Sequence, residues 1–489
     1  MAALAQGESR VRRRGAMGEL NQETEVLVVG AGPGGYAAAF RAADLGMGVT
    51  LVDTEKRPGG ECLFRGCIPS KTLLYLAELL SDAKRSSEMG VTFGKPQVDL
   101  DKIRAWKNQV IDKLTGGLLT LCKRRKIQWV QGRAIFEGSD RVRLEESEIS
   151  RIRFRHAIIA TGSYSTPFRD VSIQKGGRIM DSTGALELPD IPHSLLILGG
   201  GYIGLEMGTL YAALGSRVTV AVRSDRLLRG ADQDLTDILI FRLKEAFEAI
   251  HFNINVLSLK EQKDGVDVKF EGEINKPDQT FDRVLIAVGR KPNSGKIGLE
   301  NTKVKLDGQG FVVVDEQRRT TDEKIFAVGD VAGGPLLAHK AFREGKVAAE
   351  AIYGKPSAFD VQAIPAVVYT DPQVAWAGLR EEQARKENRN IRVERYLWKF
   401  SSRATTMGVS EGVTKMILHP ETGRILGVGI CGRNAEGMIS EGTLAIEMGA
   451  LAQDLGLTIH PHPTLSEMMG ETAELFTGTV THVLPEKRI

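Results

Sequence analysis

The sequence has few cysteines, little net charge and no long apolar run, and each shortage excludes a class of protein. Four cysteines among 489 residues are too few for a secreted disulfide scaffold, so a reducing compartment, the cytoplasm, is predicted. A net charge of +3 gives no broad basic surface for nucleic acid or for a membrane. No apolar stretch approaches the roughly 20 residues that a membrane-spanning helix needs. We therefore expect neither a nucleic-acid partner nor a membrane partner.

The length and composition indicate a globular chain of several domains. Hydrophobic residues make up 42% and charged residues 26% of a chain too long for one hydrophobic core. The first sixteen residues do not have the pattern of a folded domain, because they contain a run of arginines, and they lack the apolar core of a signal peptide. We expect a disordered extension over residues 1–22. A later start at Met17 and a short targeting peptide stay open as alternatives.

Residues 25–53 have the pattern of a nucleotide-binding unit. Apolar runs over residues 25–30 and 49–53 predict two strands, and an alanine-rich stretch over residues 36–45 predicts the helix between them. The glycines of the turn have the spacing that permits a tight turn, close approach to a pyrophosphate and packing of helix on strand. Asp53 ends the second strand, where a carboxylate accepts hydrogen bonds from an adenosine ribose. The glycines are Gly30, Gly32 and Gly35.

The same unit recurs later in the chain. Residues 195–198 and 218–222 predict strands, and residues 205–214 predict the helix. Two such units imply two dinucleotide sites in one chain. The glycines of the second turn are Gly199, Gly201 and Gly204.

Two further segments carry residue types suited to thiol chemistry. Cys62 and Cys67 lie shortly after the first glycine turn, and no second cysteine pair has the spacing of a zinc site. Near the other end, His462 precedes Glu467 in the segment His-Pro-Thr-Leu-Ser-Glu. A histidine base suits thiol chemistry because the thiolate is the nucleophile. No metal site is expected.

Together these segments resemble the pyridine nucleotide-disulfide oxidoreductases, over residues 25–476 and in the family's order. Within that family the chain is most similar to the dihydrolipoamide dehydrogenases. The resemblance implies FAD at the first turn, a redox disulfide of Cys62 and Cys67, and His462 as the base, held by Glu467. Cys67 would lie next to the flavin and Cys62 would exchange with the substrate. Implied cofactor contacts are Lys71 paired with Glu206, together with Thr161, Gly162, Gly289, Asp330 and Ala338.

The residues after the second unit's last strand depart from an NAD-specific pattern. Such a strand ends in an acid that binds the ribose hydroxyls, but Val222 stands there and Arg223 follows. Arg223 and Arg229 match the arginines that bind the 2′-phosphate in NADP-using glutathione reductases. We therefore expect NADP(H) to be favoured, with NAD(H) possible. A solvated basic loop without that role is the alternative.

The predicted fold class is α/β, with two Rossmann-like dinucleotide-binding domains, for FAD and NAD(P), and a C-terminal α+β dimerisation domain. The resemblance implies a homodimer that transfers two electrons between a dihydrolipoyl dithiol, on a lipoyl-bearing protein, and NAD(P). An NADPH-dependent reductase of glutathione or another small disulfide is the main alternative, and a non-catalytic flavin-binding subunit is a further one. The expected segments are 1–22 (extension), 23–165 (FAD), 166–290 (NAD(P)), 291–361 (FAD, second part) and 362–489 (interface).

Overall fold

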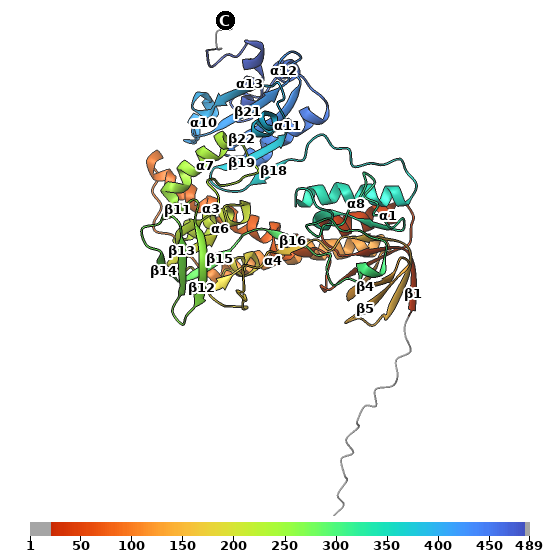
Figure 1. Ribbon diagram of the computed structural model, residues 1–489. Coiled ribbons are helices and arrows are strands. Elements are labelled where there is room, and N and C mark those ends of the chain that lie inside the picture. Colours follow the sequence, from red (N-terminus) through yellow and green to blue (C-terminus); the bar gives the residue numbers. More distant parts are fainter. Residues whose placement is uncertain (1–20, 485–489) are drawn as a thin grey trace, which may run out of the picture.

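The structure is a computed structural model that describes residues 21–484 (Figure 1). Its first sheet contains the N-terminal nucleotide-binding unit. Its seven strands run in the order β3-β2-β1-β6-β5-β4, with β17 also paired to β6. β3, β2, β1, β6 and β17 are parallel, whereas β4 and β5 add an antiparallel edge. The strands are β1 (Asn21–Val29), β2 (Val49–Asp53), β3 (Gln128–Gln131), β4 (Arg133–Gly138), β5 (Arg141–Glu145), β6 (Arg151–Ile159) and β17 (Ile325–Ala327).

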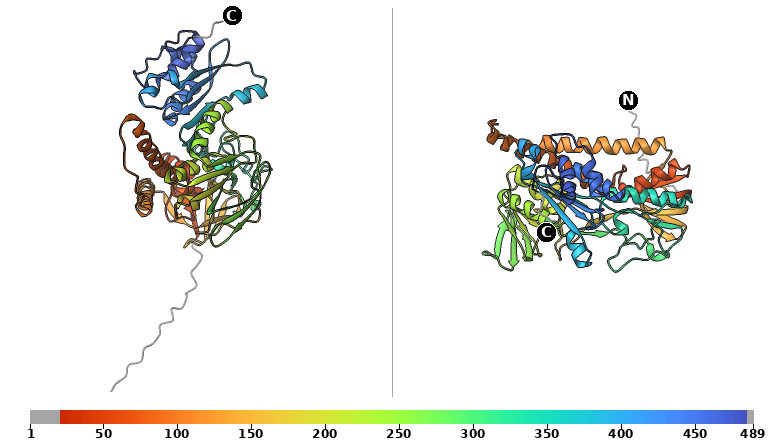
Figure 2. Two further views of the ribbon diagram at one scale, coloured as in Figure 1. Left: turned by 90° about the vertical axis from the view of Figure 1, so that its left-hand side faces the viewer. Right: turned by 90° about the horizontal axis from the view of Figure 1, so that it is seen from above.

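Both faces of this sheet are covered, which explains the unbroken apolar run of β1. Val26 and Val28 face a core shared with α1 and α8, whereas Leu27 and Val29 face the opposite core around Phe136. The helices of this lobe are α1 (Pro33–Asp44), α2 (Gly60–Arg65), α3 (Cys67–Arg85), α4 (Leu100–Arg124) and α8 (Ala338–Ile352). Figure 2, seen from above, shows the long helix α4 extending along one edge of the molecule.

The second nucleotide-binding unit forms a separate parallel sheet in the order β11-β10-β9-β15-β8. A three-stranded antiparallel sheet, β12-β13-β14, extends this lobe. The strands are β8 (Ile179–Met180), β9 (Ser194–Leu198), β10 (Arg217–Ala221), β11 (Ala249–His251), β12 (Asn255–Glu261), β13 (Val266–Glu271), β14 (Asp278–Phe281) and β15 (Arg283–Ile286). The helices are α5 (Ser182–Leu186), α6 (Tyr202–Leu214) and α7 (Gln233–Ala246).

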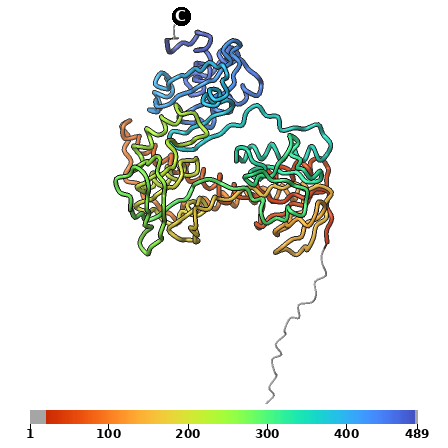
Figure 3. The backbone as a smooth tube through the Cα atoms, viewed as in Figure 1, coloured from red at the N-terminus to blue at the C-terminus, as the bar shows by residue number. Residues whose placement is uncertain are grey.

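The chain passes between these lobes through a two-stranded antiparallel ribbon of β7 (Ser163–Ser165) and β16 (Arg290–Pro292). The predicted boundaries at residues 165 and 290 fall in this ribbon. A long connection over residues 353–365 then leads to the C-terminal domain, as the tube in Figure 3 shows.

The C-terminal domain is an antiparallel sheet in the order β18-β19-β22-β21-β20, packed against helices. Its strands are β18 (Ala366–Val368), β19 (Gln373–Gly378), β20 (Arg392–Leu397), β21 (Val413–Leu418) and β22 (Ile425–Gly432). Its helices are α9 (Glu381–Lys386), α10 (Ser402–Thr406), α11 (Ala435–Glu447), α12 (Ala452–Leu457) and α13 (Glu467–Thr477). Among the described helices, none is long and apolar enough to cross a membrane.

One expectation needs correction at the N-terminal boundary. Asn21 and Gln22, predicted to belong to the disordered extension, open β1 and pair with Arg151 and Ile152 of β6. β1 begins before the apolar residues from which it was predicted, because the backbone of β6 also pairs with the polar residues that precede them. Residues 1–20 lie outside the described part of the chain.

Candidate active site

The first glycine turn lines a pocket between the ends of β1, β6 and β17 and the start of α3. Gly30 has φ +100°, and a side chain there would meet the carbonyl oxygen of Ala160 at 2.3 Å. A side chain on Gly35 would meet Gly30 O at 1.8 Å, so this glycine lets helix and strand touch. A side chain on Gly32, at the start of α1, would meet only Gly60. The open face at Gly32 and the free helix N-terminus fit a dinucleotide pyrophosphate.

Asp53 lies where the sequence predicts it, at the carboxyl end of β2 and in the wall of the pocket. Its Oδ2 accepts the backbone N–H of Ala31 at 2.6 Å, and its Oδ1 accepts that of Glu55 at 2.9 Å. The carboxylate therefore ties the glycine turn to the second strand. Its contact with a ribose stays a prediction.

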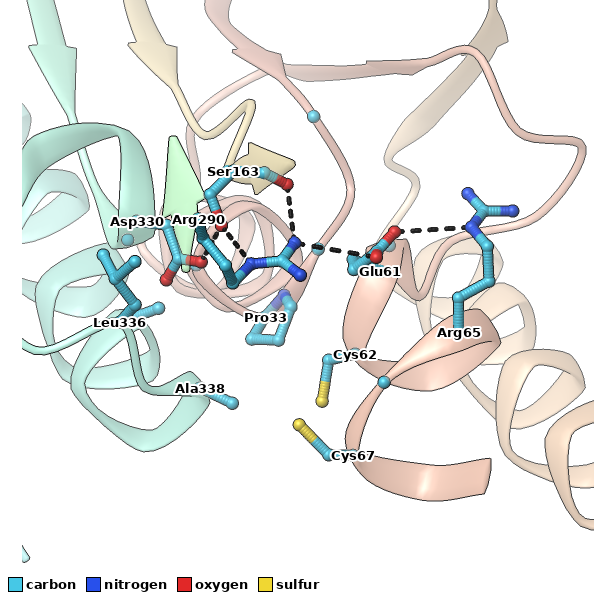
Figure 4. Close-up of a pocket in the computed structure, with 18 of the residues that line it drawn as sticks. Pro33, Glu61, Cys62, Arg65, Cys67, Ser163, Arg290, Asp330, Leu336 and Ala338 are labelled. Carbon is cyan, nitrogen blue, oxygen red and sulfur yellow. Dashed lines mark hydrogen bonds and ion pairs between the residues drawn. The ribbon is translucent and has the colours of Figure 1, made fainter. Parts of the chain in front are cut away.

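A chain of polar contacts crosses the pocket beside Asp330 (Figure 4). Ser163 Oγ donates to Asp330 Oδ2, and Arg290 Nε donates to Ser163 Oγ at 2.8 Å. The Arg290 guanidinium also lies 3.6 Å from Glu61, which is paired with Arg65. Ser163, Arg290 and Glu61 are missing from the predicted site. Their only sequence signal is adjacency, because each directly follows or precedes a residue that the resemblance marks.

The other predicted flavin contacts lie around the same pocket. Thr161, Gly162 and Ala338 line it, and Gly162 has φ +72°. Thr161 Oγ1 donates to Asn293 O at 2.7 Å, so part of its hydrogen-bonding capacity serves the crossing ribbon. Gly289, with φ +126°, does not line the pocket. Its carbonyl oxygen accepts the backbone N–H of Thr166.

Cys62 and Cys67 both line this pocket, and their sulfur atoms point toward one another (Figure 4). Cys62 lies in α2 and Cys67 begins α3, and both are free thiols in the structure. A hydrogen bond from Cys62, opposed by burial and helped by the charge of Lys71, lowers the pKa of Cys67 to about 7. The same hydrogen bond and burial raise the pKa of Cys62. Cys67 is thus the thiol of the pair that deprotonates first.

Lys71 lies one helical turn after Cys67 and reaches across to the second nucleotide-binding unit. Its Nζ donates to both carboxylate oxygens of Glu206, at 3.0 and 2.8 Å. Glu206, on α6, is 3% exposed and also accepts the N–H of Tyr369 at 3.1 Å. The Tyr369 ring lies under the ammonium, 4.5 Å from Nζ. The pairing that the resemblance implied is present, and it fixes a positive charge near Cys67.

The second glycine turn repeats the geometry of the first. A side chain on Gly199, with φ +114°, would meet Ala287 O at 2.3 Å, and one on Gly204 would meet Gly199 O at 2.6 Å. Gly201 caps α6 and opens to space, since a side chain there would meet nothing within 4 Å. These residues fit a second dinucleotide. Arg223 and Arg229 are exposed beyond β10, and within residues 21–484 neither side chain has an ion-pair partner.

His462 and Glu467 lie in the C-terminal domain, and neither lines the pocket of the cysteine pair. His462 Nδ1 is 2.8 Å from Glu467 Oε1, while Glu467 Oε2 accepts the N–H of Thr464 at 2.6 Å. The His462 side chain is 62% exposed, with Nε2 unpartnered among the described residues. His460 differs, because its two ring nitrogens contact Glu441 and Thr458. One chain therefore holds an oriented imidazole apart from its thiols.

Comparisons with known proteins show the family to which both parts of the chain are similar. Residues 24–345 match the profile described as pyridine nucleotide-disulphide oxidoreductase, and residues 364–473 match that family's dimerisation domain. The dihydrolipoyl dehydrogenase of Buchnera aphidicola subsp. Schizaphis graminum is 44% identical over 470 residues, covering 95% of this chain and 98% of the relative. That of Geobacillus stearothermophilus is 43% identical and covers 96% and 99%.

Solved structures share the fold. The Cu(II) complex of the HOCl-induced flavoprotein disulfide reductase RclA from Escherichia coli has a TM-score of 0.83 at 27% identity, covering 93% of this chain and 99% of that one. LpdA from Mycobacterium tuberculosis has a TM-score of 0.85 at 23% identity, covering 92% and 99%, which supports the fold alone.

The chain therefore belongs to the pyridine nucleotide-disulphide oxidoreductase family. Within the family it is an FAD-dependent disulfide oxidoreductase of the dihydrolipoyl dehydrogenase type. The predicted fold class and the class of reaction are confirmed.

Proposed function

We propose that this protein is an NADP(H)-preferring dihydrolipoyl dehydrogenase, whose active site combines the thiols of one subunit with the histidine of the other. One observation carries the proposal. The paired thiols lie in a glycine-lined pocket, whereas the oriented imidazole of His462 stands exposed in another domain. A base must come within hydrogen-bond distance of the thiol that it deprotonates. A second copy of the chain, placed across a two-fold axis, supplies the missing group.

The proposed substrate is a dihydrolipoyl dithiol carried on a protein. His462 of the partner subunit takes a proton from one substrate thiol, and the resulting thiolate attacks Cys62 of the Cys62–Cys67 disulfide. The S–S bond of the protein breaks and leaves Cys67 as the thiolate. The second substrate thiol then displaces Cys62 from the mixed disulfide, so the substrate leaves as a disulfide and both protein cysteines are reduced. Bound FAD supplies two-electron transfer between the cysteine pair and the nicotinamide.

The electrostatics of the site support these separate roles. A pKa of about 7 makes Cys67 a good leaving thiolate, and the ammonium of Lys71 stabilises its charge. The Glu467 carboxylate accepts a hydrogen bond from Nδ1 of His462. This contact orients the ring so that Nε2 points away from Glu467. It also stabilises the imidazolium that forms when the ring takes a proton.

Exposed apolar side chains on the C-terminal domain support a homodimer. Leu444 and Met448 of the α11 region are 62% and 76% exposed, and Leu457 and Ile459 near α12 are 73% and 96% exposed. Leu457 and Ile459 directly precede the segment that carries His462. Large apolar side chains exposed to this degree suit burial in a protein interface, and all four lie within the residues that match the family's dimerisation domain.

The coenzyme preference rests on the loop after β10. Val222 stands at the strand-end position where an acid would repel a 2′-phosphate, and Arg223 and Arg229 extend guanidinium groups that have no ion-pair partner in the described part of the chain. Arginine binds phosphate through charge-assisted, often bidentate hydrogen bonds. NADP(H) is therefore the better fit. The scarcity of cysteine supports a cytoplasmic location.

A matrix of four assays tests the proposal. Purified protein with FAD is assayed with lipoamide and with glutathione disulfide, each against NADH and NADPH. We expect the highest kcat/KM for lipoamide with NADPH, and for dihydrolipoamide with NADP⁺ in the reverse direction. Faster turnover of glutathione disulfide would favour the small-disulfide reductase instead. A clear preference for NADH would remove the coenzyme part of the proposal.

A further inference from the structure

The loop that carries Arg223 and Arg229 is fixed at its middle by the dimerisation domain. Arg226, three positions from each of them, donates to both carboxylate oxygens of Glu382 in α9, with Nη2 and Oε2 2.8 Å apart. The two side chains are only 24% and 23% exposed. The hydrogen bond from Arg226 lowers the pKa of Glu382, so the pair is ionised at neutral pH. A partly buried, bidentate pair holds its geometry better than a solvated one.

Two further contacts from the same domain hold the end of the loop. Arg380 Nη1 lies 3.5 Å from the carbonyl oxygen of Arg229. Asp232, 4% exposed, accepts the backbone N–H groups of Glu381 and Glu382 at 3.0 and 3.2 Å.

Asp232 belongs to an ion-pair cluster around a lysine, not to a metal site. Its carboxylate converges with those of Asp234 and Glu381. All three surround the buried Nζ of Lys415, at 2.9, 3.0 and 2.8 Å. The ammonium fills the centre of the cluster and locks the start of α7 to β21.

The opposite side of the loop contacts the second glycine turn. The N–H of Leu228 donates to Gly200 O at 2.9 Å. A side chain on Gly200 would lie 2.7 Å from both Leu227 and Val222, so these residues already fill the space against the turn. The loop is thus held between the coenzyme turn and the dimerisation domain, while the guanidinium groups of Arg223 and Arg229 remain exposed.

We propose that Glu382 is a positioning residue for coenzyme recognition: through Arg226 it fixes the backbone from which Arg223 and Arg229 reach the 2′-phosphate. This inference rests on the proposed use of NADP(H). Ordering a mobile loop on binding costs free energy, and a loop that is already ordered avoids that cost. Specificity for the phosphorylated coenzyme is therefore built partly by a domain that does not bind it.

Glu382→Gln tests the proposal, with Glu387→Gln as the matched control because Glu387 is an exposed glutamate at the end of the same helix. Breaking a contact between coupled residues should raise the KM for NADPH about 3- to 10-fold. We expect kcat, the KM for NADH and the FAD content to change less than about twofold. Arg226→Gln breaks the pair from the other side, so it should give the same loss, and the double variant should lose no more than either single variant.

Trypsin cleavage between Arg223 and Arg229 gives a readout without turnover. Glu382→Gln should be cut there faster than the wild type and than Glu387→Gln, and saturating NADP⁺ should slow the cleavage. An unchanged KM for NADPH, or equal losses for NADPH and NADH, would overturn the positioning role. Arg223→Ala, assayed in parallel, reports the phosphate contact itself. If it leaves NADPH kinetics unchanged, the coenzyme assignment has failed and the positioning role falls with it.

Discussion

At the scale of single residues, the two active-site thiols are the same chemical group, but their surroundings give them different pKa values. Cys67 receives a hydrogen bond and lies near the positive charge of Lys71, whereas Cys62 donates that bond. The site therefore separates a thiol that readily becomes a thiolate from one that is left to exchange with substrate. The different roles proposed for Cys62 and Cys67 follow from this asymmetry.

Serine substitutions separate these roles. A thiolate next to a flavin donates charge to it, so the two-electron-reduced protein should show a long-wavelength absorption band. Cys67→Ser should abolish the band and turnover while FAD stays bound. Cys62→Ser should block turnover but keep a thiolate band without added reductant. Absorption spectra and lipoamide assays measure both effects, and full activity of Cys62→Ser would contradict the exchange role.

The band should also titrate. Because the pKa of Cys67 is lowered to about 7, the thiolate fraction rises with pH, and the band of the reduced protein should grow with a midpoint of about 7. Cys62→Ala removes the hydrogen bond that contributes most to this lowering, so the midpoint should move to higher pH. Spectra recorded between pH 5 and 9 test both statements. A band independent of pH would mean that another group sets the thiolate population.

Residues inside motifs were the predictable part of the site. Lys71 and Glu206 lie 135 positions apart, yet each follows a recognisable segment, so their pairing could be foreseen by resemblance. Contacts within the crossing ribbon gave no comparable signal. Arg290 and Ser163 meet only because the crossing ribbon brings residues 127 positions apart side by side. Local pattern does not encode such pairing.

At the scale of the elements, the glycine turns and their strands agree closely with the sequence. β2 spans the predicted residues, because a parallel strand buried on both faces is a continuous apolar run. α1 begins three residues before the predicted helix, since Pro33 suits the first turn, where its missing N–H has no intrahelical partner. β10 ends at Ala221, which leaves Val222 as the first residue of the coenzyme loop.

Substitution in that loop tests the coenzyme preference. Losing one charge-assisted contact costs about 1.5–3 kcal/mol. Arg223→Ala and Arg229→Ala should therefore each lower the kcat/KM for NADP(H) roughly 10- to 150-fold, with little change for NAD(H). Arg155→Ala, which removes an exposed arginine of β6, is the matched control. Steady-state kinetics with both coenzymes measure this effect. If the loop variants kept the wild-type preference between NADP(H) and NAD(H), the assignment of these arginines to the 2′-phosphate would be contradicted.

At the scale of the whole molecule, three lobes divide the chemistry between them. The two nucleotide-binding lobes share the pocket of the thiols through Lys71 and Glu206, whereas the histidine lies exposed in the C-terminal domain. The α/β architecture and the two nucleotide-binding units could be predicted from the two glycine turns. The ion pairs that fix the C-terminal domain on the second lobe, such as Arg226 with Glu382, could not, because they form only once both domains are folded.

Subunit exchange tests the shared active site most directly. Cys62→Ser and His462→Gln are each expected to be inactive as pure homodimers that retain FAD. In a mixed dimer one site carries both defects and the other is intact. Equal amounts that exchange freely form half mixed dimers, so activity should return to about 25% of the wild-type value. If native mass spectrometry verifies exchange and no activity returns, the histidine does not act across the interface, and the proposed site is wrong.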